Sequence, residues 1–209
     1  MKKRILITLS LITVVLTVLL TYQPDETESL LANDGKGLFD LEAHWTQGNV
    51  VSLVRHAERC DRSESECLDG NDGITVPGVD QAVEVGKAYD YLPQQATVIF
   101  NSPVKRTDQS ADFMFGDESS DQKWLREGCK ENLLDDIFKY KEDGKNLILI
   151  THSTCIDALG EEQGDKLIEL DIHEPETYAG SFFLTVDKEE KKIHVLGYLL
   201  ADEWKVAYQ

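Results

Sequence analysis

The sequence predicts an α/β fold of three layers, in which helices flank a mainly parallel central sheet. Three short apolar runs are typical of strands that are buried on both faces, at residues 50–54, 97–100 and 147–150. Segments with helical spacing of apolar residues lie between these runs. Strands that alternate with helices along the chain favour a parallel sheet over an antiparallel one.

Three helices are expected between these strands, over residues 79–92, 103–115 and 132–140. In the first of them, Val79, Ala82 and Val83 recur at the spacing of one helix face. Pro103 is compatible with the second helix because the first turn of a helix does not need its backbone N–H as a donor.

The C-terminal part of the chain changes character. Residues 181–186 and 192–200 flank the charged run 187–191, which predicts an antiparallel hairpin with a charged turn. A chain of 209 residues suits one compact domain of ordinary size. We expect that domain to span residues 48–209.

The amino-terminal segment predicts export from the cytoplasm. A basic start, Lys-Lys-Arg, precedes residues 5–20, which are apolar apart from Thr and Ser. A cleavage site is not evident, because Ala32 is the nearest small residue at a suitable position and Leu30 stands where another small residue is preferred. Residues 1–22 are therefore interpreted as a signal peptide or an uncleaved membrane anchor, followed by a polar tether over residues 23–47. The domain would then lie outside the cytoplasmic membrane.

The formal net charge of the chain is -18, which argues against a nucleic acid partner held through its phosphates. Strong acidity of this kind serves solubility in most proteins. An anionic substrate would therefore need a local cluster of arginine or lysine side chains.

All four cysteines, Cys60, Cys67, Cys129 and Cys155, fall in the part that would be exported. An even number in an oxidising compartment favours two disulfides, and the sequence alone does not choose among the three pairings. We prefer Cys60–Cys67, which closes a small polar loop, together with Cys129–Cys155, which ties a helix start to a strand end. Cys-x-x-Cys spacing is absent, so no metal site is expected. We expect no other cofactor.

The candidate functional residues follow the three predicted strands. Ligands of open α/β sheets bind outside the carboxyl ends of the strands, so these segments would meet at one edge. Each segment alone could be a solvated loop, a surface helix or a packed histidine. The residues are Arg55, His56, Arg59 and Arg62 after the first strand, Arg106 one helical turn past Ser102 after the second, and His152 after the third.

Together these segments resemble the histidine phosphatase superfamily. That family has an Arg-His-Gly signature after its first strand, a Ser-x-x-x-Arg-Thr-x-Gln-Thr-Ala-like helix start and a second His after a later strand. Residues 74–82 match its Leu-Thr-x-x-Gly-x-x-Gln-Ala element, and the resemblance covers residues 50–152. It implies a phosphoglycerate mutase-like fold. Ala57 and Ser153 stand where the family pattern has glycines. These differences weaken the assignment of this chain to the mutase branch of the superfamily.

The resemblance is narrower when the cysteines are included. The export signal, the run Arg-His-Ala-Glu-Arg-Cys-Asp-Arg-Ser and the positions of Cys67, Cys129 and Cys155 resemble periplasmic phosphatases that act on a phosphorylated heptose of the lipopolysaccharide core. This resemblance implies a phosphorylated sugar or the lipopolysaccharide core as the substrate.

For the site residues, the family resemblance implies a phosphohistidine intermediate. His56 would attack phosphorus as a neutral imidazole, because nearby guanidinium charges lower the pKa of a histidine. His152 would also stabilise charge in the transition state. Arg62 either assists or belongs to the loop. The groups expected to hold the phosphoryl oxygens are Arg55, Arg59, Arg106 and His152.

The general acid is less clear from the sequence. Glu127 occupies the region in which relatives of the mutase type carry their acid, and a carboxyl group near a phosphate dianion has a raised pKa. A Cys129–Cys155 disulfide would bring Glu127 close to His152 and preorganise the site. The alternatives for the acid are Glu58, Asp117 and Glu118.

Two other functions remain open at this stage. One is a broad periplasmic phosphatase for sugar phosphates or nucleotides, because specificity lies in the loops around residues 60–72 and 112–130. The other is a phosphoglycan-binding module without turnover. The complete set of His56, Arg59, Arg106 and His152 argues against this second alternative.

Overall fold

A computed structural model describes residues 27–162 and 170–208 of the chain. The predicted export segment over residues 1–22 and the first residues of the predicted tether lie outside these ranges. Within the described ranges, no helix has the length and apolar character that a membrane crossing requires.

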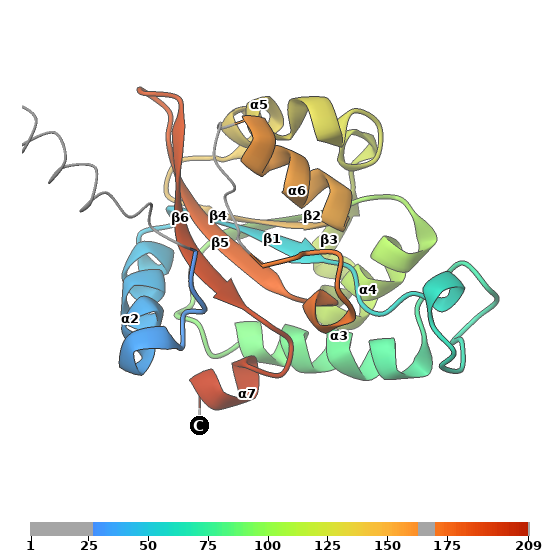
Figure 1. Ribbon diagram of the computed structural model, residues 1–209. Helices are drawn as coiled ribbons and strands as arrows, with labels where there is room; N and C mark the ends of the chain where they lie inside the picture. Colours follow the sequence, from blue (N-terminus) through green and yellow to red (C-terminus); the bar gives the residue numbers. More distant parts are fainter. Residues whose placement is uncertain (1–26, 163–169, 209) are drawn as a thin grey trace, which may run out of the picture.

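The centre of the molecule is a six-stranded mixed sheet with the strand order β3-β2-β4-β1-β5-β6 (Figure 1). The first four strands in this order are parallel, whereas β5 is antiparallel to β1 and β6 is antiparallel to β5. This arrangement confirms the predicted mainly parallel sheet with a C-terminal hairpin. The strands are β1 (Val50–Arg55), β2 (Thr97–Asn101), β3 (Ser119–Asp121), β4 (Asn146–Thr151), β5 (Ser181–Asp187) and β6 (Lys192–Leu199).

Helices cover both faces of the sheet and complete the three layers (Figure 1). One layer holds α2 (Ala32–Thr46), α3 (Val76–Tyr89), α4 (Lys105–Phe115) and α7 (Trp204–Ala207), and the other holds α5 (Cys129–Tyr140) and α6 (Ser153–Glu162). Short 3₁₀ turns join these elements: η1 (Cys60–Arg62), η2 (Gly116–Glu118), η3 (Lys123–Leu125) and η4 (Pro175–Thr177).

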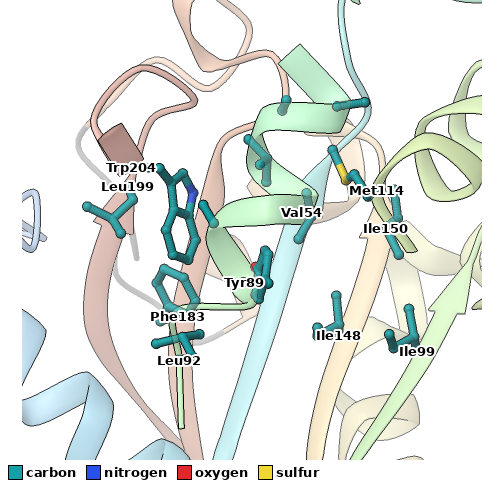
Figure 2. Close-up of a cluster of buried hydrophobic side chains, with 14 of the residues drawn as sticks. Val54, Tyr89, Leu92, Ile99, Met114, Ile148, Ile150, Phe183, Leu199 and Trp204 are labelled. Atoms are coloured by element: carbon teal, nitrogen blue, oxygen red, sulfur yellow. The ribbon is translucent and has the colours of Figure 1, made fainter. Parts of the chain in front are cut away.

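Every residue of β1 and of β4 is buried, as expected for the middle strands of a sheet that is covered on both faces. Alternate side chains of β1 enter different cores: Val50 and Val54 pack towards α3, while Val51 and Leu53 pack towards α5 and α6. Figure 2 shows the first core, in which Val54 lies near Tyr89. The continuous apolar run of β1 therefore reflects burial on both sides of the strand.

The predicted tether over residues 23–47 is wrong for most of its length. Residues 32–46 form α2, whose Leu41 is fully buried and whose Trp45 donates from Nε1 to the carbonyl oxygen of Pro93 at 3.0 Å. Residues 34–37 predicted a turn. The structure does contain one at the start of this helix, where Asn33, Asp34 and Gly35 all have positive φ. The folded domain therefore begins well before residue 48.

A short segment before α2 covers the outer edge of β6. The backbone N–H of Leu30 donates to the carbonyl oxygen of Tyr198 at 2.9 Å, and that of Tyr198 donates to the carbonyl oxygen of Glu28 at 3.3 Å. A Cβ at Gly197 would lie 2.8 Å from the Glu28 oxygen, so this close approach requires glycine there. Leu30 is 1% exposed and belongs to the core.

Candidate active site

The site is built at the carboxyl ends of the parallel strands. Arg55 and Thr151 are paired at the ends of β1 and β4. The backbone N–H of His56 donates to the carbonyl oxygen of Thr151 at 3.0 Å, and that of Ser102 donates to the carbonyl oxygen of Ile150 at 3.1 Å. The three segments that the sequence placed at one edge therefore do meet there.

Arg106 joins the two histidines of the site. Its Nε donates to Nε2 of His56 at 3.2 Å, and its Nη2 donates to Nδ1 of His152 at 3.1 Å. The centroids of the two imidazole rings are 5.5 Å apart. Arg106 reaches both rings because it lies in the first turn of α4, which begins shortly after the carboxyl end of β2.

His56 is held as a neutral imidazole with one defined tautomer. Its Nδ1 donates to the carbonyl oxygen of Ala57 at 2.8 Å, so its Nε2 carries the lone pair that accepts from Arg106. Burial, and then the positive charge of Arg106, lower the pKa of His56 well below its usual value of 6.5. The ring therefore presents a lone pair inside a cluster of cations.

His152 is neutral for the same physical reasons. Its Nδ1 accepts from Arg106, so its Nε2 donates to the hydroxyl oxygen of Ser102 at 3.0 Å. Burial first, followed by the charges of Arg106, Arg59 and Arg126, lowers the pKa of His152 from 6.5 to about 4.

Arg55 is 3% exposed and is held by a segment that comes from the other end of the chain. Its Nη1 donates to the carbonyl oxygen of Glu174 at 2.7 Å and to the hydroxyl of Thr177. Its guanidinium carbon lies 3.9 Å from the ring centroid of Tyr178, a cation–π contact. Burial lowers the pKa of Arg55. The sequence reasoning missed this segment, because no motif marks it and its residues lie far from Arg55 in the chain.

Two further predicted residues lie beside the histidine pair. The guanidinium of Arg59 binds both carboxylate oxygens of Asp61 through Nε and Nη2. Arg62 is exposed at the end of η1, and its charge helps to lower the pKa of Arg55 and of Arg106. Both side chains therefore add positive charge to the site without a direct bond to either histidine.

Other motif residues position the loop that carries His56. The backbone N–H of Ala57 donates to the hydroxyl oxygen of Ser110 at 2.9 Å, and this hydroxyl donates to the carbonyl oxygen of Arg106 at 2.6 Å. One buried hydroxyl of α4 thus connects the loop to the arginine that binds both rings.

Glu58, one alternative for the general acid, forms hydrogen bonds within the loop that follows β1. Its carboxylate accepts from the hydroxyls of Ser63 at 2.6 Å and of Thr75 at 2.7 Å. The Thr75 hydroxyl also accepts from the backbone N–H of Gly78 at 3.0 Å and so caps α3. A Cβ at Gly78 would lie 2.8 Å from the carbonyl oxygen of Glu58, which explains the glycine of this motif.

The preferred disulfide pairing is confirmed. Cys60 bonds to Cys67, and Cys129 bonds to Cys155, with Cα atoms 5.5 Å and 5.4 Å apart. The second bond ties the start of α5 to the first turn of α6, three residues past His152. The turn between η3 and α5 is therefore fixed next to the second histidine.

The structure separates the remaining acid candidates. Glu127 is exposed in the turn before α5, and within the described part of the chain its carboxylate forms no hydrogen bond or ion pair. Asp117 and Glu118 cannot serve the site, because α4 runs away from the carboxyl edge and η2 follows it at the amino edge. There Glu118 lines a cavity of about 720 Å³ together with Trp45 and other residues. These two alternatives are wrong.

Comparisons with known proteins indicate the family of this chain. No protein-family model matches the chain. The chain is 34% identical over 156 residues to the lipopolysaccharide core heptose(II)-phosphate phosphatase of Salmonella newport (strain SL254), a match that covers 74% of this chain and 76% of that protein. It is 36% identical over 125 residues to the Salmonella typhi protein of the same name, covering 59% of this chain and 60% of that protein.

Solved structures share the fold at low sequence identity. A protein described as a phosphohistidine phosphatase, from Agrobacterium tumefaciens, has a TM-score of 0.52 and 17% identity, covering 72% of this chain and 97% of that one. The phosphoserine phosphatase of Entamoeba histolytica, solved with 3-phosphoglyceric acid, has a TM-score of 0.51 and 14% identity, covering 71% and 95%.

The fold and the two histidines around one shared arginine agree with the histidine phosphatase superfamily that the sequence resembles. Within the superfamily, the chain belongs to the family of lipopolysaccharide core heptose(II)-phosphate phosphatases.

Proposed function

We propose that this protein is an exported phosphomonoesterase that removes phosphate from a heptose of the lipopolysaccharide core, with His56 as the nucleophile. The observation that carries the proposal is the state of His56. Its Nδ1–H is fixed on the backbone, and its Nε2 lone pair faces the guanidinium of Arg106 at 3.2 Å. A neutral nucleophile surrounded by cations suits attack on a phosphomonoester dianion, which would repel an anionic one.

The first step forms a bond between His56 Nε2 and phosphorus while the bond from phosphorus to the ester oxygen breaks. The sugar oxygen leaves with a proton from a general acid. Water then attacks phosphorus and gives a proton to the carboxylate left by the general acid, while the bond from phosphorus to Nε2 breaks and releases inorganic phosphate and the free imidazole. Throughout, the carbonyl oxygen of Ala57 stabilises the positive charge that the ring acquires, because it accepts from Nδ1.

Four side chains would hold the phosphoryl oxygens. Arg106 already donates towards the space between the two rings, and His152 lies on its other side. Arg55 supplies a buried positive charge next to His56. Arg59 would exchange the carboxylate of Asp61 for phosphoryl oxygens, since a guanidinium fork fits either group.

Glu127 is the proposed general acid. It follows Leu125, whose carbonyl oxygen lies 3.9 Å from Sγ of Cys155, and it precedes the disulfide by two residues. This attachment supports a position beside His152 at the carboxyl edge of the sheet. An exposed carboxyl group here could meet the leaving sugar oxygen when substrate is bound.

The proposed substrate and compartment rest on the family. The relatives named above act, by their names, on heptose(II) phosphate of the lipopolysaccharide core. Two disulfides and the basic and apolar start of the chain support an oxidising compartment outside the cytoplasm.

The chemical step is tested by the substitution His56→Ala. The variant should lose at least about 10⁴-fold in kcat on a chromogenic phosphate ester, because the covalent route is removed. Rapid quenching with a ³²P-labelled ester should trap label on wild-type protein and none on the variant. His194→Ala, at an exposed position on β6, is the matched control and should behave as wild type. Retained turnover in the His56 variant would exclude the mechanism.

The substrate is tested in cells. Mass spectrometry of core lipopolysaccharide from cells with active protein should show one phosphate less than that from cells with the His56→Ala variant. Equal core phosphorylation, combined with rapid turnover of diverse sugar phosphates in vitro, would favour the broad phosphatase instead.

A further inference from the structure

The arginines of this protein are concentrated at one place. The described part of the chain contains five, and all of them lie in or beside the site: Arg55, Arg59, Arg62, Arg106 and Arg126. The protein around them is strongly acidic, with 39 Asp and Glu residues against 21 Lys and Arg residues. Several guanidinium groups at one sheet edge repel one another, so a ligand with matching negative charge is the expected compensation.

These arginines differ in depth. Arg55 is 3% exposed and Arg106 is half-buried, whereas Arg62 and Arg126 are exposed. A phosphoryl group offers three oxygens, which the inner arginines and His152 can already bind. The two outer guanidinium groups are therefore available to other parts of a bound molecule.

The outer arginines also lack acidic partners. Among residues 27–162 and 170–208, neither Arg62 nor Arg126 forms a hydrogen bond or an ion pair through its side chain, although carboxylates are abundant on the surface. Arg59, by contrast, binds Asp61, and Lys105 binds Asp69 and Asp72. The unpaired guanidinium groups are free to bind an external anion.

Each outer arginine is held by a disulfide. Arg62 ends the turn η1 that begins at Cys60, and the Cys60–Cys67 bond closes its loop. Arg126 follows the fully buried Leu125 and lies three residues before Cys129, which is bonded to Cys155. The loops that carry them belong to opposite layers of the sheet, one next to α3 and the other next to α5. The two positive charges are thus presented on two sides of the phosphate position by restrained backbone.

We propose that Arg62 and Arg126 bind anionic groups of the substrate other than the phosphate that is cleaved. The substrate class is then a phosphorylated saccharide that carries at least one further negative group near the scissile phosphate. This inference rests on the proposed phosphatase function and refines it, because a saccharide with a single phosphate would use only the inner arginines.

The test compares one sugar with one phosphate and with two. Glucose 6-phosphate and glucose 1,6-bisphosphate are assayed with wild-type protein, Arg62→Gln, Arg126→Gln, the double variant and the control Lys130→Gln. Lys130 is exposed in the first turn of α5, so its substitution removes the same charge four residues from Arg126 without touching the inner cluster.

Wild-type protein should prefer the bisphosphate by roughly tenfold in kcat/KM. Each arginine variant should lose roughly three- to tenfold on the bisphosphate through KM, with a clearly smaller loss on the monophosphate, and the double variant should lose the preference. High salt should reduce the wild-type preference, because exposed charges are screened. The Lys130 control should match wild type.

Equal wild-type kcat/KM for the two sugars, or equal losses on both sugars in the arginine variants, would overturn the inference. Calorimetry should also measure the affinity of His56→Ala protein for both sugars. This measurement distinguishes failure of the anion site from failure of the proposed phosphatase function. If no sugar is hydrolysed by wild type but the bisphosphate binds more tightly in an Arg62- and Arg126-dependent way, the anion site stands and the phosphatase assignment falls. Equal binding of the two sugars would remove the anion site.

Discussion

The two histidine segments of the site begin alike and are held differently. Each follows a buried strand, each places an imidazole against Arg106, and each contains a cysteine a few residues later. After β1 the chain forms an irregular loop, which hydrogen bonds from Ser110 and the hydroxyls around Glu58 hold in place. After β4 the chain enters α6 at once, and a disulfide joins this helix to α5.

The difference fits the roles that we propose for the two rings. His56 needs a fixed tautomer, and only a loop that turns back on itself lets its Nδ1 donate to the carbonyl oxygen of Ala57, the next residue. His152 needs to face an anion, and its place immediately before the N-terminus of α6 is favourable for negative charge. The His56 segment is therefore positioned by polar contacts and a disulfide within its own loop, and the His152 segment by a helix and a disulfide to a second helix.

The largest effect is expected where the two segments share a residue. Arg106→Ala should lower kcat/KM on a chromogenic phosphate ester by about 10³-fold, because it removes a charged donor from both rings and from the phosphate. Arg106→Lys should recover little, since an ammonium group cannot donate from two fixed directions. Steady-state kinetics on variants with wild-type circular dichroism provides the measurement. A lysine variant with near-wild-type kcat would contradict the shared contact.

Removing the disulfides one at a time should sharpen the comparison. Loop closure across 26 residues predicts a loss of about 3.5 kcal/mol of unfolding free energy for Cys129→Ala/Cys155→Ala, against about 2.4 kcal/mol across 7 residues for Cys60→Ala/Cys67→Ala. Urea denaturation of both double variants checks this order. The first variant should also lose about tenfold in kcat on the chromogenic ester, if that bond preorganises His152. Unchanged turnover in folded protein without this bond would show that the disulfide does not preorganise the site.

An effect on stability similar to the loss of the smaller disulfide is expected at acid pH. The pKa of His152 is about 4 in the folded protein and near 6.5 in the unfolded chain, so between these values the unfolded state binds a proton that the folded state refuses. Stability is therefore full above about pH 6.5 and falls by about 2–3 kcal/mol as the pH approaches 4. His56 acts in the same direction. As the pH falls through this range, the urea midpoint of wild type should fall more than that of His152→Asn. Parallel curves would contradict a lowered pKa of His152 in the folded protein.

The sequence was most informative where local pattern and topology coincide. Buried strands gave continuous apolar runs, and the catalytic candidates His56 and His152 stand directly after two of them. Arg106 could be placed near the end of β2 because a helix was expected there, although that helix begins only at Lys105. These predictions needed only short-range periodicity and the rule that parallel strands end at one edge.

Features that depend on distant contacts were not predictable. α2 presents few apolar residues, and only contacts across the fold show that Leu41 and Trp45 are core positions. β3 consists of three polar residues at the sheet edge, and α6 carries no strong pattern. Thr177 and Tyr178 hold Arg55 from the far end of the chain. Asp117 and Glu118 lie at the amino edge of the sheet, because α4 carries the chain away from the carboxyl edge before η2 begins.

The strand added by residues 28–30 limits where this chain can be shortened. Unpaired edge strands invite pairing with other molecules, and here the outer edge of β6 is occupied by the Glu28–Leu30 backbone. A cut at Ala32 would remove both this cover and the buried Leu30 side chain. A shortened protein that starts at residue 27 should stay monomeric, whereas one that starts at residue 33 should self-associate through β6, and light scattering would distinguish the two.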